Sequence, residues 1–221
     1  MNSKVQTLLK STLVLLSYIF YNQIIYSIFS IFNINDLNTN WIYAFISDFI
    51  FFGFVFVLYF DALKSGVKDL KNQFGSKFKL GLKWLIISLI AQALMLILLD
   101  SFLPPLSENM VAVVDLNIIY MIFKTLFFST IAEELVFKKS IRDVVSNKVV
   151  FIILSSILYG FMNIAYTNIT SPIDLLNIFP YMVAMMAMCT LYVKTDNIVL
   201  VMLMNFLYNL IPLILMITVG I

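Results

Sequence analysis

The sequence predicts an all-α fold: a polytopic bundle of transmembrane helices in a single domain over residues 1–221. Hydrophobic residues make up 62% of the chain and charged residues only 12%, whereas about a quarter of a typical soluble protein is charged. A chain of 221 residues cannot bury so much apolar surface in one water-soluble core. Long apolar stretches also recur along the chain, separated by short polar or basic segments. We therefore expect an integral membrane protein.

About seven stretches are long and apolar enough to cross a bilayer as helices. They are Leu9–Phe32, Trp41–Phe60, Trp84–Leu103, Leu116–Phe137, Val149–Tyr166, Ile173–Val193 and Ile198–Ile217. The fifth stretch is short, so we expect it to tilt or to sink partly between its neighbours. The first stretch is too long for a signal peptide and lacks a cleavage site of small residues, which favours a retained anchor.

The basic residues predict a cytoplasmic N-terminus. The loops at 33–40, 104–115 and 167–171 contain no lysine or arginine, and thirteen of the fourteen basic residues fall on the other side of the spans. The positive-inside rule makes that side cytoplasmic and leaves the C-terminus outside. The lysine-rich segment Asp61–Lys83 is expected to be an ordinary cytoplasmic loop, with binding of anionic lipid as the alternative.

The cysteine and histidine content limits the chemistry. The single cysteine, Cys189, excludes an internal disulfide and is predicted to be a small apolar side chain within a helix. The chain has no histidine, which is the usual residue for acid–base catalysis and for binding transition metals. The abundance of Asn, Ile, Lys and Phe is typical of an AT-rich bacterial genome, so we expect a bacterial plasma membrane.

Two adjacent carboxylates, Glu133 and Glu134, lie in the fourth predicted span. A charged side chain at the centre of a bilayer costs about 2.5–3.5 kcal/mol on insertion scales, so such a pair indicates a function. Neighbouring residues on an α-helix point about 100° apart, so only one can face a cavity squarely. Lys138 follows Glu134 at the spacing that favours an ion pair. We expect Glu133 to face a cavity and Glu134 to brace the helix through Lys138; an interfacial pair that reaches cytoplasmic water is the alternative.

Amides form the second set of polar residues within the spans. Asn163 lies in the fifth span, and Asn205 and Asn209 lie one helical turn apart on one face of the seventh. Asparagines in membrane helices more often form interhelical hydrogen bonds than take part in catalysis. Asp48 and Lys124 are isolated charges, and no spacing connects them to the other polar residues.

The order of these motifs resembles the CPBP family of intramembrane proteases, which includes the CAAX prenyl endopeptidases and the Abi-type bacteriocin-processing and immunity proteins. The family's first motif is two glutamates, three residues and an arginine; Glu133–Lys138 reproduces it with lysine in place of arginine. The second is an aromatic residue, three residues and a histidine, and Tyr159–Asn163 matches it with asparagine last. The third is a histidine, three residues and an asparagine or aspartate, which corresponds to Asn205–Asn209 with asparagine in the first position. The resemblance covers residues 116–217.

The resemblance implies a catalytic role for four positions. In the family, the first glutamate and the second motif's histidine activate a water molecule, and the third motif stabilises the oxyanion. Carried over by position, Glu133 is the general base and Asn163 its partner, while Asn205 and Asn209 are the oxyanion donors. The resemblance gives a structural, supporting role to Glu134, Lys138 and Tyr159.

Both histidines of the family are asparagine in this chain. A carboxamide neither gains nor loses a proton near neutral pH, and losing a positioned acid–base group costs about a hundredfold to ten-thousandfold in rate. Asn205 can still donate a hydrogen bond to an oxyanion. Lys138 lacks the bidentate fork of an arginine. Without histidine, and with Cys189 in another span, no usual set of metal ligands remains, so we expect no metal and no other cofactor.

Two hypotheses from different classes follow. The first is a weakly active or inactive relative that binds a membrane-associated peptide or a partner helix, or that serves as a self-immunity protein. The alternative is an active, metal-independent glutamate endopeptidase in which Glu133 activates water. A transporter is a third interpretation, but it predicts inverted repeats or glycine-rich broken helices, and the chain has six glycines. We expect membrane lipid as a partner and no nucleic acid.

Overall fold

The computed structural model describes residues 3–30, 40–100, 117–165 and 172–219, and all its regular structure in these ranges is helical. This confirms the predicted all-α fold. In chain order the elements are α1 (Ser3–Ser30), α2 (Asn40–Leu58), α3 (Phe60–Asn72), α4 (Phe74–Asp100), α6 (Ile118–Ile122), η3 (Phe123–Glu133), η4 (Leu135–Ser140), α7 (Ile141–Val144), α8 (Lys148–Ile164), η5 (Pro172–Asn177), α9 (Ile178–Thr195) and α10 (Ile198–Val219).

Several helices have the length and composition of membrane spans. Within the described residues, five segments qualify: Lys4–Ile25, Trp41–Leu58, Phe74–Asp100, Pro172–Thr195 and Ile198–Leu215. Helix α8 is apolar but has only 17 residues, in line with the short fifth stretch of the sequence. The fourth predicted stretch belongs to the helical run from α6 to α7, which carries several charges. The chain is therefore an integral membrane protein, while the count of seven spans and the cytoplasmic N-terminus stay predictions.

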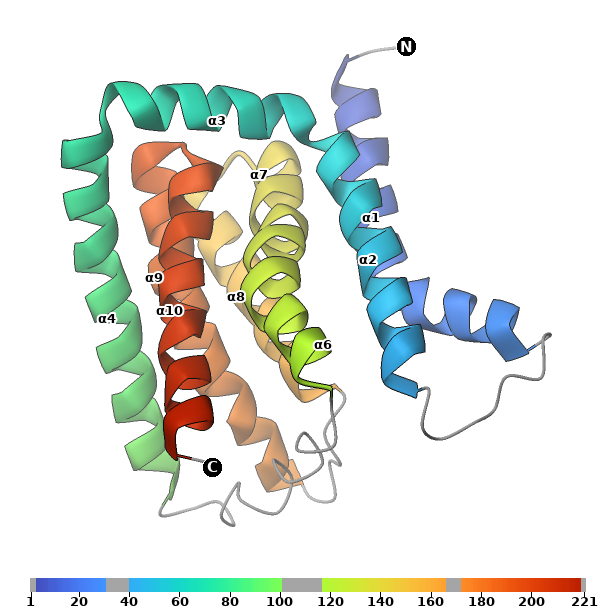
Figure 1. The fold of residues 1–221 in the computed structure, drawn as a ribbon. Coiled ribbons are helices and arrows are strands. Elements are labelled where there is room, and N and C mark those ends of the chain that lie inside the picture. The colour runs from blue at the N-terminus through green and yellow to red at the C-terminus, as the bar shows by residue number, and fades with distance from the viewer. Residues whose placement is uncertain (1–2, 31–39, 101–116, 166–171, 220–221) are drawn as a thin grey trace.

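The long helices form a bundle with one helix lying across its end (Figure 1). Helix α9 packs against α8 and α4, and α10 packs against η3, α4 and α3. The hairpin of α1 and α2 lies at one side of the bundle and contacts the run from η3 to α7. The N-terminus is at the end where α3 lies, and the C-terminus is at the opposite end.

The run from α6 to α7 is one continuous helix with two π-helical segments. Asn117 caps its start, because its side-chain oxygen accepts a hydrogen bond from the backbone N–H of Ile119 at 2.9 Å. The π-helical segments are η3 and η4, and Glu134 lies between them. π-Helical turns are rare and occur frequently at functional sites. The glutamate pair thus lies at the junction of two such segments.

Helix α3 is docked on the start of α10. Its buried residues are Leu63, Gly66 and Leu70. A Cβ atom at Gly66 would come within 2.8 Å of Val199 Cγ2, so only glycine allows this approach without a shift. Asn197 Nδ2 donates to the Gly66 carbonyl at 2.9 Å, while its side-chain oxygen accepts from the backbone N–H of Leu200. One asparagine therefore caps α10 and holds α3.

Asp69 strengthens this docking from the next turn of α3. Its carboxylate pairs with Lys77 and accepts a hydrogen bond from Asn197 at 2.5 Å. The Lys77 ammonium, followed by Asn197, lowers the pKa of Asp69 below its usual value. A lowered pKa favours the folded state above the unfolded pKa of about 4, and this contribution is lost as the pH falls through the folded value. The contact is therefore fully present at neutral pH.

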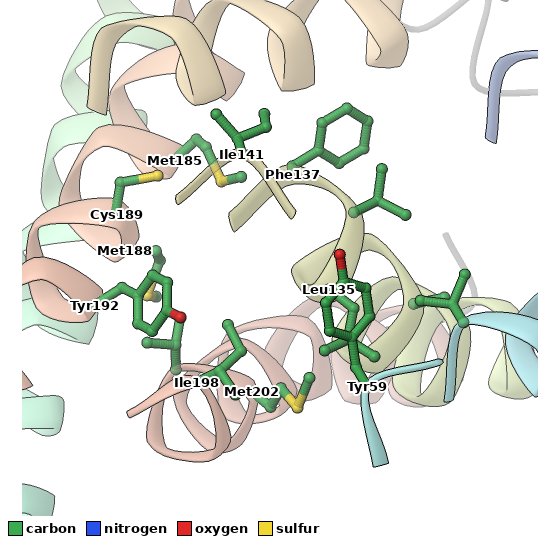
Figure 2. Close-up of a cluster of buried hydrophobic side chains, with 14 of the residues drawn as sticks. Tyr59, Leu135, Phe137, Ile141, Met185, Met188, Cys189, Tyr192, Ile198 and Met202 are labelled. Carbon is green, nitrogen blue, oxygen red and sulfur yellow. The ribbon is translucent and has the colours of Figure 1, made fainter. Parts of the chain in front are cut away.

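A cluster of buried apolar side chains fills the space among η4, α7, α9 and α10, together with Tyr59 (Figure 2). It includes Cys189 of α9, which is a free and fully buried thiol. Cys189 thus occupies the position of a small apolar side chain that its sequence context predicts.

Gly160 lets α8 and α9 approach closely. A Cβ atom at this position would lie 2.7 Å from Ile178 Cγ1 and 3.0 Å from the Ile178 carbonyl oxygen. Small residues at helix contacts are typical of membrane bundles, since they bring backbones together. Gly160 therefore fixes the position of α8, the helix that carries Asn163.

We predict that Gly160→Leu lowers the free energy of unfolding by about 1–3 kcal/mol, because the added side chain meets backbone that cannot move aside. Unfolding in mixed detergent micelles measures this. The matched control is Gly53→Leu, since a Cβ atom at Gly53 of α2 has nothing within 4 Å. An equal loss in both variants would contradict close α8–α9 packing at Gly160.

Candidate functional site

A buried ion pair lies in the interior of the bundle. Lys138 Nζ is 2.5 Å from Glu134 Oε1, and the exposed fractions of the two side chains are 0% and 3%. The i,i+4 pair expected from the sequence is thus present in the structure. Asn205 Nδ2 of α10 donates to the same oxygen at 2.9 Å. Two donors, Lys138 of η4 and Asn205 of α10, therefore bind one carboxylate oxygen of Glu134.

The other carboxylate oxygen, Glu134 Oε2, is buried and has no hydrogen-bond partner among the described residues. The residue Glu134 lines a cavity of about 200 Å³ among α4, η3, η4, α8, α9 and α10. Six of the seven site residues predicted from the sequence line this cavity: Glu134, Lys138, Tyr159, Asn163, Asn205 and Asn209. We name it the Glu134 cavity.

Glu133 faces a second cavity of about 340 Å³, which we name the Glu133 cavity. Its lining comes from η3 and α8 and also from α1, whose Tyr18 donates its hydroxyl to Glu133 Oε1 at 3.1 Å. Asn163 and Ser129 line both cavities. The structure thus brings Glu133 and Asn163 to one cavity, and it places the third-motif amides in the other.

The three amide nitrogens donate to groups of the bundle. Asn209 Nδ2 donates to the Thr125 carbonyl at 3.1 Å, which is an interhelical bond from α10 to η3. Asn205 forms its interhelical bond with Glu134 at 2.9 Å. Asn163 Nδ2 instead donates to the Tyr159 carbonyl of its own helix at 2.9 Å.

Asp48 and Lys124, isolated in the sequence, form an ion pair across α2 and η3 at 2.8 Å. Asp48 is 1% exposed and also accepts hydrogen bonds from Tyr21 at 2.6 Å and Tyr120 at 3.0 Å. Lys124 Nζ lies 4.0 Å above the Phe128 ring and lines the Glu133 cavity. Residue spacing could not reveal this pair, because its members are far apart in the chain. The available signal was two opposite charges within otherwise apolar spans.

The residues do not fit a metal site of the usual kind. No three Cys, Asp or Glu side chains gather in the described ranges of the chain. Glu134 Oε1 is engaged by Lys138 and Asn205, and an ammonium beside a carboxylate disfavours a bound cation. We therefore derive no step that involves a metal.

Comparison with known proteins gave one match. Residues 115–211 match the family model of the type II CAAX prenyl endopeptidase Rce1-like proteins, and this segment includes all seven predicted site residues. No curated protein and no solved structure matches the chain. Tyr18, Tyr21 and Asp48, which complete the surroundings of Glu133 and Lys124, lie outside the matched segment.

We predict that Lys138→Met destabilises the protein by about 3–5 kcal/mol, because it leaves Glu134 buried without its cation. The double variant Lys138→Met with Glu134→Gln should recover most of this loss, since no unpaired charge remains. Unfolding in mixed micelles measures both.

Lys139→Met is the matched control for that prediction. Lys139 pairs with Asp143 at the same i,i+4 spacing, but both side chains are partly exposed, so its loss should cost about 0–1 kcal/mol. Equal effects of Lys138→Met and Lys139→Met would contradict a buried, obligatory pair.

Proposed function

We propose that this chain is a weakly active or inactive member of the CPBP family, and the match of residues 115–211 to the Rce1-like family model supports this. In this proposal it keeps the polar interior of its family as a binding site. The ligand is a membrane-associated peptide or a partner helix, and the Glu134 cavity receives part of it.

The observation that carries the proposal is the hydrogen bonding of the Asn163 side chain. It occupies the position of the family histidine beside Glu133, and its amide donates to the Tyr159 carbonyl of its own helix. A carboxamide cannot take a proton from water or deliver one to a leaving amine. Glu133 therefore lacks an acid–base partner at this position, which supports binding over rapid catalysis.

The Glu134 cavity has the chemistry of a receptor for hydrogen-bond donors. Glu134 Oε2 is a buried acceptor without a partner in the described part of the chain. A buried polar group left unpaired costs about 1–3 kcal/mol, and in this proposal a ligand whose N–H or O–H group reaches that oxygen recovers part of this. Peptide backbones and polar side chains supply such donors. A volume of about 200 Å³ suits a small part of a peptide rather than a folded partner.

A self-immunity role in a bacterial plasma membrane fits the same proposal. Such a protein must recognise a peptide that acts at the membrane, and an intramembrane polar cavity offers a place for it. Binding alone would be sufficient for protection, so the asparagines at the histidine positions would be tolerated.

The alternative is slow endopeptidase activity at the Glu133 cavity. It is favoured by the position of Glu133 and Asn163 around one cavity of about 340 Å³. Glu133 would take a proton from water, the hydroxide would attack the peptide carbonyl, and the C–N bond would break. Glu133 would then have to return the proton to the leaving amine, because Asn163 cannot.

We predict that the purified protein cleaves labelled, membrane-anchored peptides at or near background rates. The variant Asn163→His with Asn205→His should raise any turnover by about a hundredfold to ten-thousandfold, because it restores titrating side chains. A gel-based cleavage assay in nanodiscs measures both, and anisotropy of the labelled peptide measures binding in the same samples.

Glu133→Gln is the control for that assay, since it removes the carboxylate and keeps the shape. Rapid turnover by the parent protein that Glu133→Gln abolishes would overturn the proposal in favour of the endopeptidase. Absence of both turnover and peptide binding in the parent would overturn the binding role as well.

A further inference from the structure

Helix α3 lies between two candidate membrane spans. The candidate span of α2 ends at Leu58, and α3 begins two residues later at Phe60. Helix α3 ends at Asn72, and the next candidate span begins at Phe74. Single residues connect both ends of α3 to candidate spans, and α3 lies across the end of the bundle (Figure 1), which is the placement of a helix along the membrane surface.

A row of lysines runs along one flank of α3. Lys64, Lys68 and Lys71 follow one another at spacings of four and three residues, which places them on the same side of the helix. All three are exposed, and none forms an ion pair within the described residues. Asp69 of the same helix does not pair with these lysines, because its carboxylate forms an ion pair with Lys77.

Exposed apolar side chains accompany the lysine row. Phe60 is 50% exposed and precedes Lys64 by four residues, and Val67 is 42% exposed and precedes Lys71 by four. On a helix, residues four apart are neighbours, so each apolar side chain lies beside a lysine. The buried face of α3 is separate, since it consists of Leu63, Gly66 and Leu70.

From this geometry we propose that the flank of α3 formed by Phe60, Lys64, Val67, Lys68 and Lys71 binds the headgroups of anionic phospholipids. The lysines contact lipid phosphates, and Phe60 and Val67 enter the boundary of the acyl chains. Helices that lie in the membrane interface combine lysines with apolar side chains in this way. A surface built only for a soluble acidic protein would not need the exposed apolar residues. The inference does not depend on the function proposed for the glutamate cavities.

A fluorescent reporter on this flank of α3 measures its preference for anionic lipid. The chain has two tryptophans, Trp41 and Trp84, and both are replaced by Phe while Phe60→Trp supplies the reporter. The probes are brominated phosphatidylglycerol and brominated phosphatidylcholine, mixed in increasing fractions into vesicles that contain the protein. Each lysine near an anionic surface contributes about a fivefold preference, so we expect at least tenfold stronger apparent binding of the anionic lipid.

Two triple variants test the origin of that preference. Changing Lys64, Lys68 and Lys71 to Gln should abolish it, whereas changing the same three to Arg should retain it. High salt should weaken it in the parent, because surface charges are screened. Equal quenching by the two lipids in the parent, or an undiminished preference in the Gln variant, would overturn the proposal. The comparison of two lipids on the parent protein decides the matter even where a triple variant folds poorly.

Discussion

The buried pair of Lys138 and Glu134 is the constraint on which the rest of the site depends. Two opposite charges that are removed from water must neutralise each other closely, because the loss of either leaves an expensive unpaired charge. The i,i+4 spacing makes the pair local to one helix. Asn205 connects the pair to α10, the helix that packs against η3 and η4.

The two adjacent glutamates therefore have different surroundings. One oxygen of Glu134 is bound by Lys138 and Asn205, and the other is buried without a hydrogen-bond partner among the described residues, while the residue lines the Glu134 cavity. Glu133 faces a different cavity and receives the Tyr18 hydroxyl from α1. The family-matched segment therefore holds the site residues, but the α1–α2 hairpin completes the wall around Glu133 and binds Lys124 through Asp48.

The sequence predicted whatever depends on local pattern. Apolar stretches indicated membrane helices, and the spacing of Glu134 and Lys138 indicated their ion pair. The ordered motifs indicated the kind of family whose model matches residues 115–211. Contacts between distant segments could not be predicted, such as the Asp48–Lys124 pair and the bond from Asn205 to Glu134. The docking of α3 depends on Asn197, a residue that no motif singles out.

The π-helical segments are a second reason for the limits of sequence reasoning. Side-chain directions around Glu133 were inferred from an α-helix of about 3.6 residues per turn. The wider turns of η3 and η4 change these directions on both sides of Glu134. Which of the two glutamates Asn205 contacts is therefore a property of the folded helix.

The central claim is that the Asn205 side chain stabilises the bundle through its hydrogen bond to Glu134, and that it does not act together with Glu133. A double-mutant cycle between Asn205→Leu and Glu134→Gln, followed by unfolding in mixed micelles, tests it most directly. Since hydrogen bonds to charged groups contribute about 1.5–3 kcal/mol, we predict a coupling energy in this range. The parallel cycle between Asn205→Leu and Glu133→Gln should give a coupling near zero. A larger coupling to Glu133 than to Glu134 would contradict the account.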